Sequence, residues 1–85
     1  MARAQDRSPG RDGVAFAVPL PLESTTGSNI RSGPGVDFGV AFTVGGGTYL
    51  IGHSHSGEWI HVEAVDGREG WIHHTLVRVR GAGDP

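Results

Sequence analysis

Turn-forming residues interrupt this chain at short intervals, and they constrain its fold more than any other sequence feature. Three clusters mark the turns: Gly33-Pro34-Gly35, Gly45-Gly46-Gly47 and Asp66-Gly67. The chain contains 15 glycines and 5 prolines among its 85 residues, and these two residues are the poorest helix formers. A helical bundle is therefore disfavoured, and we expect a small, turn-rich, all-β domain.

The composition excludes several other classes of protein. The sequence has no cysteine, which excludes a disulfide framework, a thiolate zinc site and a cysteine nucleophile. Hydrophobic residues make up 36% of the chain, which is too many for a simply disordered sequence. The formal net charge is −2 with neutral histidines, and this disfavours a nucleic-acid partner, which usually needs a basic face.

The chain divides into an N-terminal arm over residues 1–26, a barrel domain over residues 27–80 and a tail over residues 81–85. The arm contains an apolar stretch from Val14 to Leu22 that two prolines interrupt. This stretch is too short for a signal peptide or a membrane-spanning helix. We therefore expect no membrane span and favour a cytoplasmic location.

Apolar side chains alternate along the arm, and this pattern allows two interpretations. The alternating residues are Phe16, Val18, Leu20 and Leu22. The arm could fold onto the domain as an added edge strand, or it could insert into a partner protein. The second hypothesis is favoured, because a module of this size has only binding to offer. These four residues are accordingly predicted to contact a partner.

The remaining chain is expected to form short strands separated by turns about every ten residues. Strands are predicted over residues 29–32, 36–44, 48–53, 58–65, 69–73 and 76–80. The segment 36–44 is the most regular, because Phe38, Val40, Phe42 and Val44 occupy alternate positions, as in a half-buried strand. This spacing is typical of a small five-stranded barrel.

The Asp66-Gly67 dipeptide predicts a hairpin, and its register decides which side chains face outward. A two-residue turn would place Val62 opposite Trp71, whereas a three-residue loop ending at Arg68 would place Val62 opposite Ile72. The second register is preferred, because both aliphatic side chains then face inward.

Three motifs in this order resemble the bacterial Src-homology-3 (SH3b) domain family. Asn29–Gly35 (NIRSGPG) resembles its opening motif, and Gly57–Val62 (GEWIHV) with Asp66–His73 (DGREGWIH) resembles its second half. Leu76-Val77 lies where that family closes its barrel. The resemblance covers about residues 27–79.

The resemblance implies a five-stranded SH3-like barrel with a short 3₁₀ turn near His73–Thr75, and it implies a non-catalytic binding module. Many such domains bind peptidoglycan peptides, and others bind proteins. The proline-peptide groove of the related eukaryotic domains has a tryptophan at the position of Trp59. His73 and Leu76 stand where that groove has its proline and second tyrosine, and this departure disfavours proline-rich ligands.

The preferred hairpin register predicts an exposed binding face. It places His61 opposite His73 and Trp71 opposite Glu63, with Trp59 adjoining. Exposed aromatic side chains provide contact area at low entropic cost. The alternative is that Trp71 caps the barrel end and Trp59 covers a loop. The residues predicted to contact a ligand or partner are Trp59, His61, Trp71, His73, Leu76 and Phe38.

The sequence gives little support for catalysis, metal binding or a cofactor. There is no G-x-S-x-G motif, and the absence of lysine excludes a P-loop. Because adjacent residues of a strand point to opposite faces, His73 and His74 are not expected to share a metal ion. A pH-dependent contact through His61 and His73 is a weaker hypothesis. The leading prediction is a protein-interaction subunit of a larger assembly, and the alternative is a module that targets peptidoglycan peptides.

Overall fold

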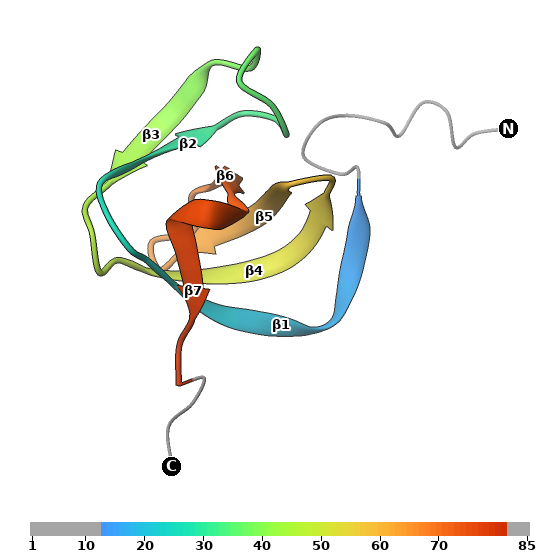
Figure 1. The fold of residues 1–85 in the computed structure, drawn as a ribbon, viewed down its shortest axis with the longest axis vertical. Coiled ribbons are helices and arrows are strands. Elements are labelled where there is room, and N and C mark those ends of the chain that lie inside the picture. Colours follow the sequence, from blue (N-terminus) through green and yellow to red (C-terminus); the bar gives the residue numbers. More distant parts are fainter. Residues whose placement is uncertain (1–12, 82–85) are drawn as a thin grey trace, which may run out of the picture.

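One strongly curled antiparallel sheet makes up the domain (Figure 1). The structure is a computed structural model that describes residues 13–81. Seven strands follow one another across the sheet in the order β3-β2-β6-β5-β4-β1-β7. The elements are β1 (Val14–Ser24), β2 (Ser28–Arg31), β3 (Val40–Val44), β4 (Tyr49–Ser56), β5 (Trp59–Ala64), β6 (Glu69–His73), the 3₁₀ helix η2 (His74–Leu76) and β7 (Val77–Val79).

The expected all-β class and small-barrel architecture are confirmed, whereas residues 13–81 form seven strands rather than the five of the expected barrel. The strand that the predicted segments lack is β1, which pairs with β4 and β7 and extends the sheet, whereas β7 lies within the predicted segment 76–80. The predicted 3₁₀ turn is present as η2. Among residues 13–81, no helix has the length and apolarity needed to cross a membrane.

Strand β1 forms from the segment that was predicted as an arm, and it pairs with both β4 and β7. Leu22 is only 1% exposed, and Leu20 packs against the same core. Phe16 is half-buried, with its ring centroid 5.5 Å from that of His55, whereas Val18 is exposed. The hypothesis of a free arm inserting into a partner is therefore wrong for residues 14–24. The remaining calls on residues 1–12 and 82–85 lie outside the described residues.

The core lies on the concave side of the sheet and combines side chains from five strands. Its buried members are Leu22, Ile30, Leu50, Val62, Ala64 and Ile72. Strands β2 and β6 approach closely at Gly70, where an added Cβ would lie 2.5 Å from Cγ2 of Ile30 and 2.8 Å from the carbonyl oxygen of Arg31. Glycine is therefore required at this position if β2 is to reach β6.

The β5–β6 hairpin has a three-residue loop, as preferred, but its register differs from both predicted registers. Ile60 pairs with Ile72 and Val62 pairs with Gly70. The loop begins one residue earlier than predicted, because the N–H of Ala64 bonds to the carbonyl of Arg68 and Gly67 adopts φ 93°. The shift amounts to two positions, so Val62 and Ile72 still face the core, as expected.

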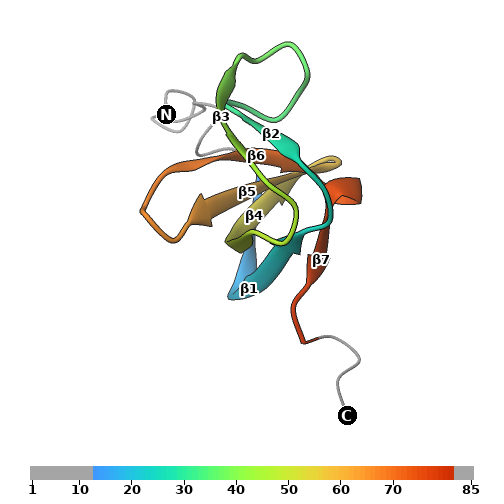
Figure 2. The same cartoon turned by 90° about the vertical axis from the view of Figure 1, so that its left-hand side faces the viewer.

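The predicted strand 36–44 begins only at Val40, and residues 32–39 form a projecting loop (Figure 2). The alternation of apolar residues ends here because Phe38 packs on Gly33, where an added Cβ would lie 2.5 Å from the phenyl ring. The guanidinium of Arg31 donates through Nη1 to the carbonyl oxygens of Phe38 at 3.0 Å and Val36 at 3.4 Å. The loop is thereby tied to the end of β2.

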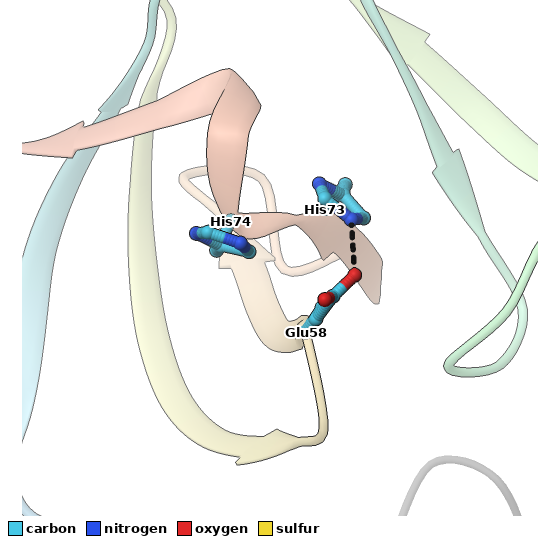
Figure 3. A group of neighbouring side chains, drawn as sticks. All are labelled: Glu58, His73 and His74. Atoms are coloured by element: carbon cyan, nitrogen blue, oxygen red, sulfur yellow. Dashed lines mark hydrogen bonds and ion pairs between the residues drawn. The ribbon is translucent and has the colours of Figure 1, made fainter.

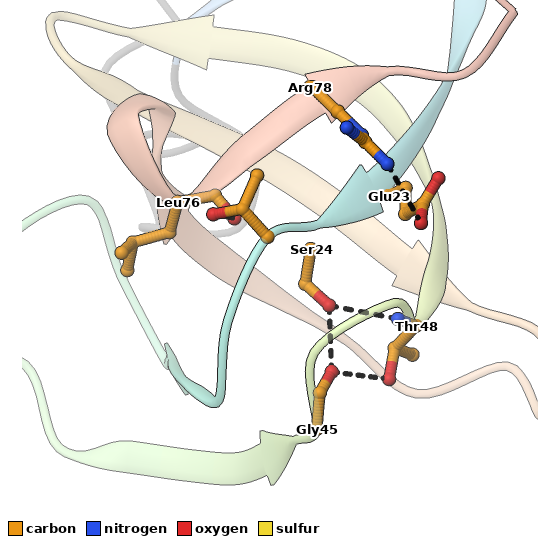
Figure 4. A network of polar contacts seen from close by, with 7 residues as sticks. Glu23, Ser24, Gly45, Thr48, Leu76 and Arg78 are labelled. Carbon is orange, nitrogen blue, oxygen red and sulfur yellow. Dashed lines mark hydrogen bonds and ion pairs between the residues drawn. The ribbon is translucent and has the colours of Figure 1, made fainter.

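A polar network fixes the end of β1 against the β3–β4 turn (Figure 4). Ser24 is 1% exposed, and its hydroxyl donates to the carbonyl of Gly45 at 2.7 Å and accepts from the N–H of Thr48 at 2.9 Å. The Thr48 hydroxyl donates to the same carbonyl at 2.7 Å. Glu23 and Arg78 form a longer contact of 3.5 Å across β1 and β7. These bonds anchor β1 as an integral strand of the domain.

Candidate functional site

A groove lies between the loop 32–39 and the junction of β6 with η2. Its volume is about 340 Å³, within the range of small ligand sites. The lining combines apolar, polar and charged side chains from segments that are distant in the sequence. The lining residues are Gly27, Ser28, Asn29, Arg31, Val36, Trp59, His73, Thr75 and Leu76.

Trp59 and His73 form the aromatic wall of the groove. They are paired across β5 and β6, and their rings meet edge to face with centroids 5.2 Å apart at 89°. The imidazole of His73 is held on both sides, by Oγ1 of Thr75 at 2.8 Å from Nδ1 and by Oε1 of Glu58 at 3.1 Å from Nε2. This wall is therefore pre-organised before any ligand arrives.

The opposite wall comes from β2 and the projecting loop. Arg31 brings a positive charge to the groove while its Nη1 supports the loop, and Val36 lines the groove beside it with an exposed apolar side chain. Leu76 adds a further apolar surface, and its carbonyl oxygen accepts the N–H of Thr25 at 2.9 Å. The groove thus combines an aromatic side, an apolar side and one fixed cation.

A family model described as the bacterial SH3 domain matches residues 25–78, more than half of the chain. The chain belongs to the bacterial SH3 domain family. The predicted resemblance over residues 27–79 is thereby confirmed, and the groove belongs to a fold whose members are binding domains. Searches of curated proteins and of solved structures find no significant match.

The groove of this bacterial SH3 domain brings together three of the six residues predicted for ligand or partner contact. Trp59, His73 and Leu76 line it. Phe38 does not line it but packs against Gly33 within the loop 32–39.

The predicted set missed five lining side chains, those of Ser28, Asn29, Arg31, Val36 and Thr75. A signal for two of them was available. Asn29 and Arg31 flank the buried Ile30 on a strand, so alternation places both on the opposite face.

Trp71 is fully buried, at 0% exposure, and its prediction as part of an exposed face is wrong. Strand β6 lies between β5 and β2, and Ile72 on the opposite face is also 0% exposed, so both faces of the strand are covered. The predicted pairing of His61 with His73 is likewise wrong, because His61 pairs with Trp71. Among residues 13–81, the indole N–H of Trp71 has no hydrogen-bond partner.

His61 does not line the groove and belongs to a second cluster, on the same face of β5 and β6 as Trp59 and His73. Its ring centroid lies 5.2 Å from Trp71 and 5.8 Å from His53. Its Nε2 lies 3.1 Å from a carboxylate oxygen of Glu69, and its side chain is 12% exposed. Burial lowers the pKa of His61, while the Glu69 carboxylate opposes this shift. Because burial dominates, the neutral imidazole is favoured here.

The expectation that adjacent histidines point apart is wrong at His73 and His74. Strand β6 ends at His73 and η2 begins at His74, so the chain leaves the extended conformation between them. The two ring centroids lie 4.9 Å apart with 32° between the planes. The ring of His74 therefore lies beside that of His73, although His74 does not line the groove.

Proposed function

We propose that this domain is a protein-interaction module that binds a short extended peptide segment of a partner within a larger assembly, in the groove beside Trp59. The supporting observation is the pre-organised groove, where the edge-to-face pair of Trp59 and His73 faces the fixed cation Arg31. Membership in a family of binding domains is consistent with this use.

The chemistry of the groove restricts the peptides that it suits. Trp59 offers one aromatic surface, whereas a polyproline helix needs parallel aromatic ridges. Arg31 offers N–H donors that match the geometry of a carboxylate. Val36 and Leu76 provide the apolar contacts. A segment with an apolar side chain followed by an acidic group or a terminal carboxylate fits this arrangement best.

The test is selection of peptides from a phage-displayed random library, followed by titration of the enriched peptides against the full chain. Replacement Trp59→Ala should weaken binding by at least about tenfold, as expected for loss of an aromatic anchor. Val36→Asp tests the same groove from an exposed position, at 72% exposure, where the fold does not depend on the side chain. Val65→Asp, at 79% exposure and outside the groove, is the matched control.

Equal binding by wild type, Trp59→Ala and Val36→Asp would exclude the groove as the binding site. Failure to enrich any peptide would also contradict the proposal.

A peptidoglycan peptide is the alternative ligand for the same groove. Such peptides carry free carboxylates, which the guanidinium of Arg31 would bind through its N–H donors. Sedimentation with purified murein sacculi distinguishes the two functions. Retention of wild type but not of Trp59→Ala on sacculi would favour cell-wall targeting, whereas no retention would favour a protein partner.

A further inference from the structure

Three metal-ligating side chains meet at the corner where the β4–β5 turn approaches the β6–η2 junction (Figure 3). They are Glu58, His73 and His74, and their ligand atoms all lie within 4.8 Å of one another. One carboxylate and two imidazoles are donors that transition-metal ions prefer, whereas magnesium and calcium prefer oxygen donors alone.

The backbone holds these three residues together independently of their side chains. The N–H of His74 donates to the carbonyl oxygen of Glu58 at 3.0 Å, which ties the start of η2 to the start of β5. The change from strand to 3₁₀ helix between His73 and His74 brings both imidazoles to one side. The cluster is therefore a consequence of the fold and not of side-chain flexibility alone.

We propose that Glu58, His73 and His74 form a binding site for a divalent transition-metal ion of the zinc class. Each residue supplies one ligand atom, and a tetrahedral ion with three protein ligands keeps its fourth position open to water or another ligand. The site goes beyond the proposed peptide binding and does not depend on it.

The present distances allow the site to close around an ion. Ligand atoms at about 2.0–2.1 Å from a tetrahedral ion lie about 3.4 Å apart. Nε2 of His73 and Oε1 of Glu58 already lie 3.1 Å apart. The carboxylate of Glu58 belongs to a side chain that is 73% exposed, and His74 is also exposed, so both can adjust without disturbing the core.

A second residue orients the central ligand. Oγ1 of Thr75 lies 2.8 Å from Nδ1 of His73 and can accept the Nδ1–H when Nε2 coordinates the ion. In the absence of an ion, Nε2 instead faces the Glu58 carboxylate. The backbone N–H of Thr75 donates to Nδ1 at 3.3 Å in this structure. Metal binding at Nε2 would thus replace the bond to Glu58 and place the ring proton on Nδ1, where the Thr75 hydroxyl accepts it in place of that backbone bond.

The test is isothermal titration calorimetry, in which zinc chloride is added to the full chain prepared without a histidine tag. We expect one zinc ion per chain. His74→Ala should weaken binding by at least about tenfold, and Thr75→Val should weaken it by about tenfold through loss of the orienting hydroxyl. His53→Ala is the matched control, because His53 also pairs with a carboxylate, that of Glu63 at 2.9 Å.

A spectroscopic measurement locates the ion independently of the variants. Zinc should shift backbone amide resonances of residues 57–59 and 73–75 in a nitrogen–proton correlation spectrum, and circular dichroism should show that each variant retains the fold. Absence of saturable zinc binding would overturn the proposal. Binding that persists in His74→Ala, or that is lost in His53→Ala, would also overturn it.

Discussion

Replacement of Gly70 by alanine tests the close approach of β2 and β6 on which the groove depends. The added Cβ would lie 2.5 Å from Cγ2 of Ile30 and 2.8 Å from the carbonyl oxygen of Arg31. Ile30 is 0% exposed and the second contact is with backbone, so neither neighbour can rotate away. The two strands must therefore separate by several tenths of an ångström.

The expected loss in the free energy of unfolding follows from the known effects of overpacking a protein interior. An extra methyl group in a well-packed interior costs about 1–3 kcal/mol, and the backbone contact places Gly70→Ala at about 2–3 kcal/mol. For a domain of this size, each kcal/mol lowers the melting temperature by about 4–8 °C. Thermal unfolding followed by circular dichroism should therefore show a decrease in melting temperature of about 8–24 °C. Urea unfolding followed by tryptophan fluorescence should give the same loss of free energy.

Gly45→Ala is the matched control, because a Cβ at Gly45 meets nothing within 4 Å among the described residues and its φ is not positive. This variant should be unchanged or slightly stabilised by about 0.4–1 kcal/mol, since alanine restricts the unfolded chain. If Gly70→Ala unfolds at the same temperature as Gly45→Ala, the close approach of β2 to β6 is refuted.

Two further predictions concern pH and the buried polar network. Burial lowers the pKa of His61 in the folded state below its ordinary value of 6.5. Between the folded-state pKa and the unfolded-state pKa, the unfolded chain therefore binds more protons than the folded chain. The free energy of unfolding should fall as pH decreases through that window. His61→Gln should reduce this dependence in urea titrations at about pH 7.5 and about pH 5.5, and an unchanged dependence would contradict the assignment. Ser24→Ala leaves the N–H of Thr48 without its side-chain acceptor and should cost about 1–3 kcal/mol in thermal unfolding. An unchanged free energy of unfolding would show that the bond between Ser24 and Thr48 contributes little to stability.

The candidate groove could be predicted only in part, because its two walls come from segments that are distant in the sequence. The local motif around Trp59 indicated the aromatic wall, and the family resemblance indicated His73 and Leu76. Arg31 enters the groove because β2 crosses to pair with β6 at Trp71. No local pattern specifies that pairing, so its contribution depends on long-range contacts.

Strand β1 is a second case in which the sequence could not identify the pairing partner. Alternating apolar residues predicted a strand that needs a partner, and alternation alone cannot say which chain supplies it. The structure supplies β4 and β7 of the same chain. Leu22 reaches the core, and the buried Ser24 completes the network at the β3–β4 turn.

By itself, the sequence determined the all-β class, the turns, the inward faces of Val62 and Ile72, and membership in the bacterial SH3 domain family. These features depend on residue propensity and on spacing within a few positions, which are local properties of the chain. Only the tertiary structure decided that Trp71 is buried and that His73 and His74 lie side by side. The physical reason is that burial depends on which strands cover a face, and side-chain direction depends on where a strand ends against its neighbours.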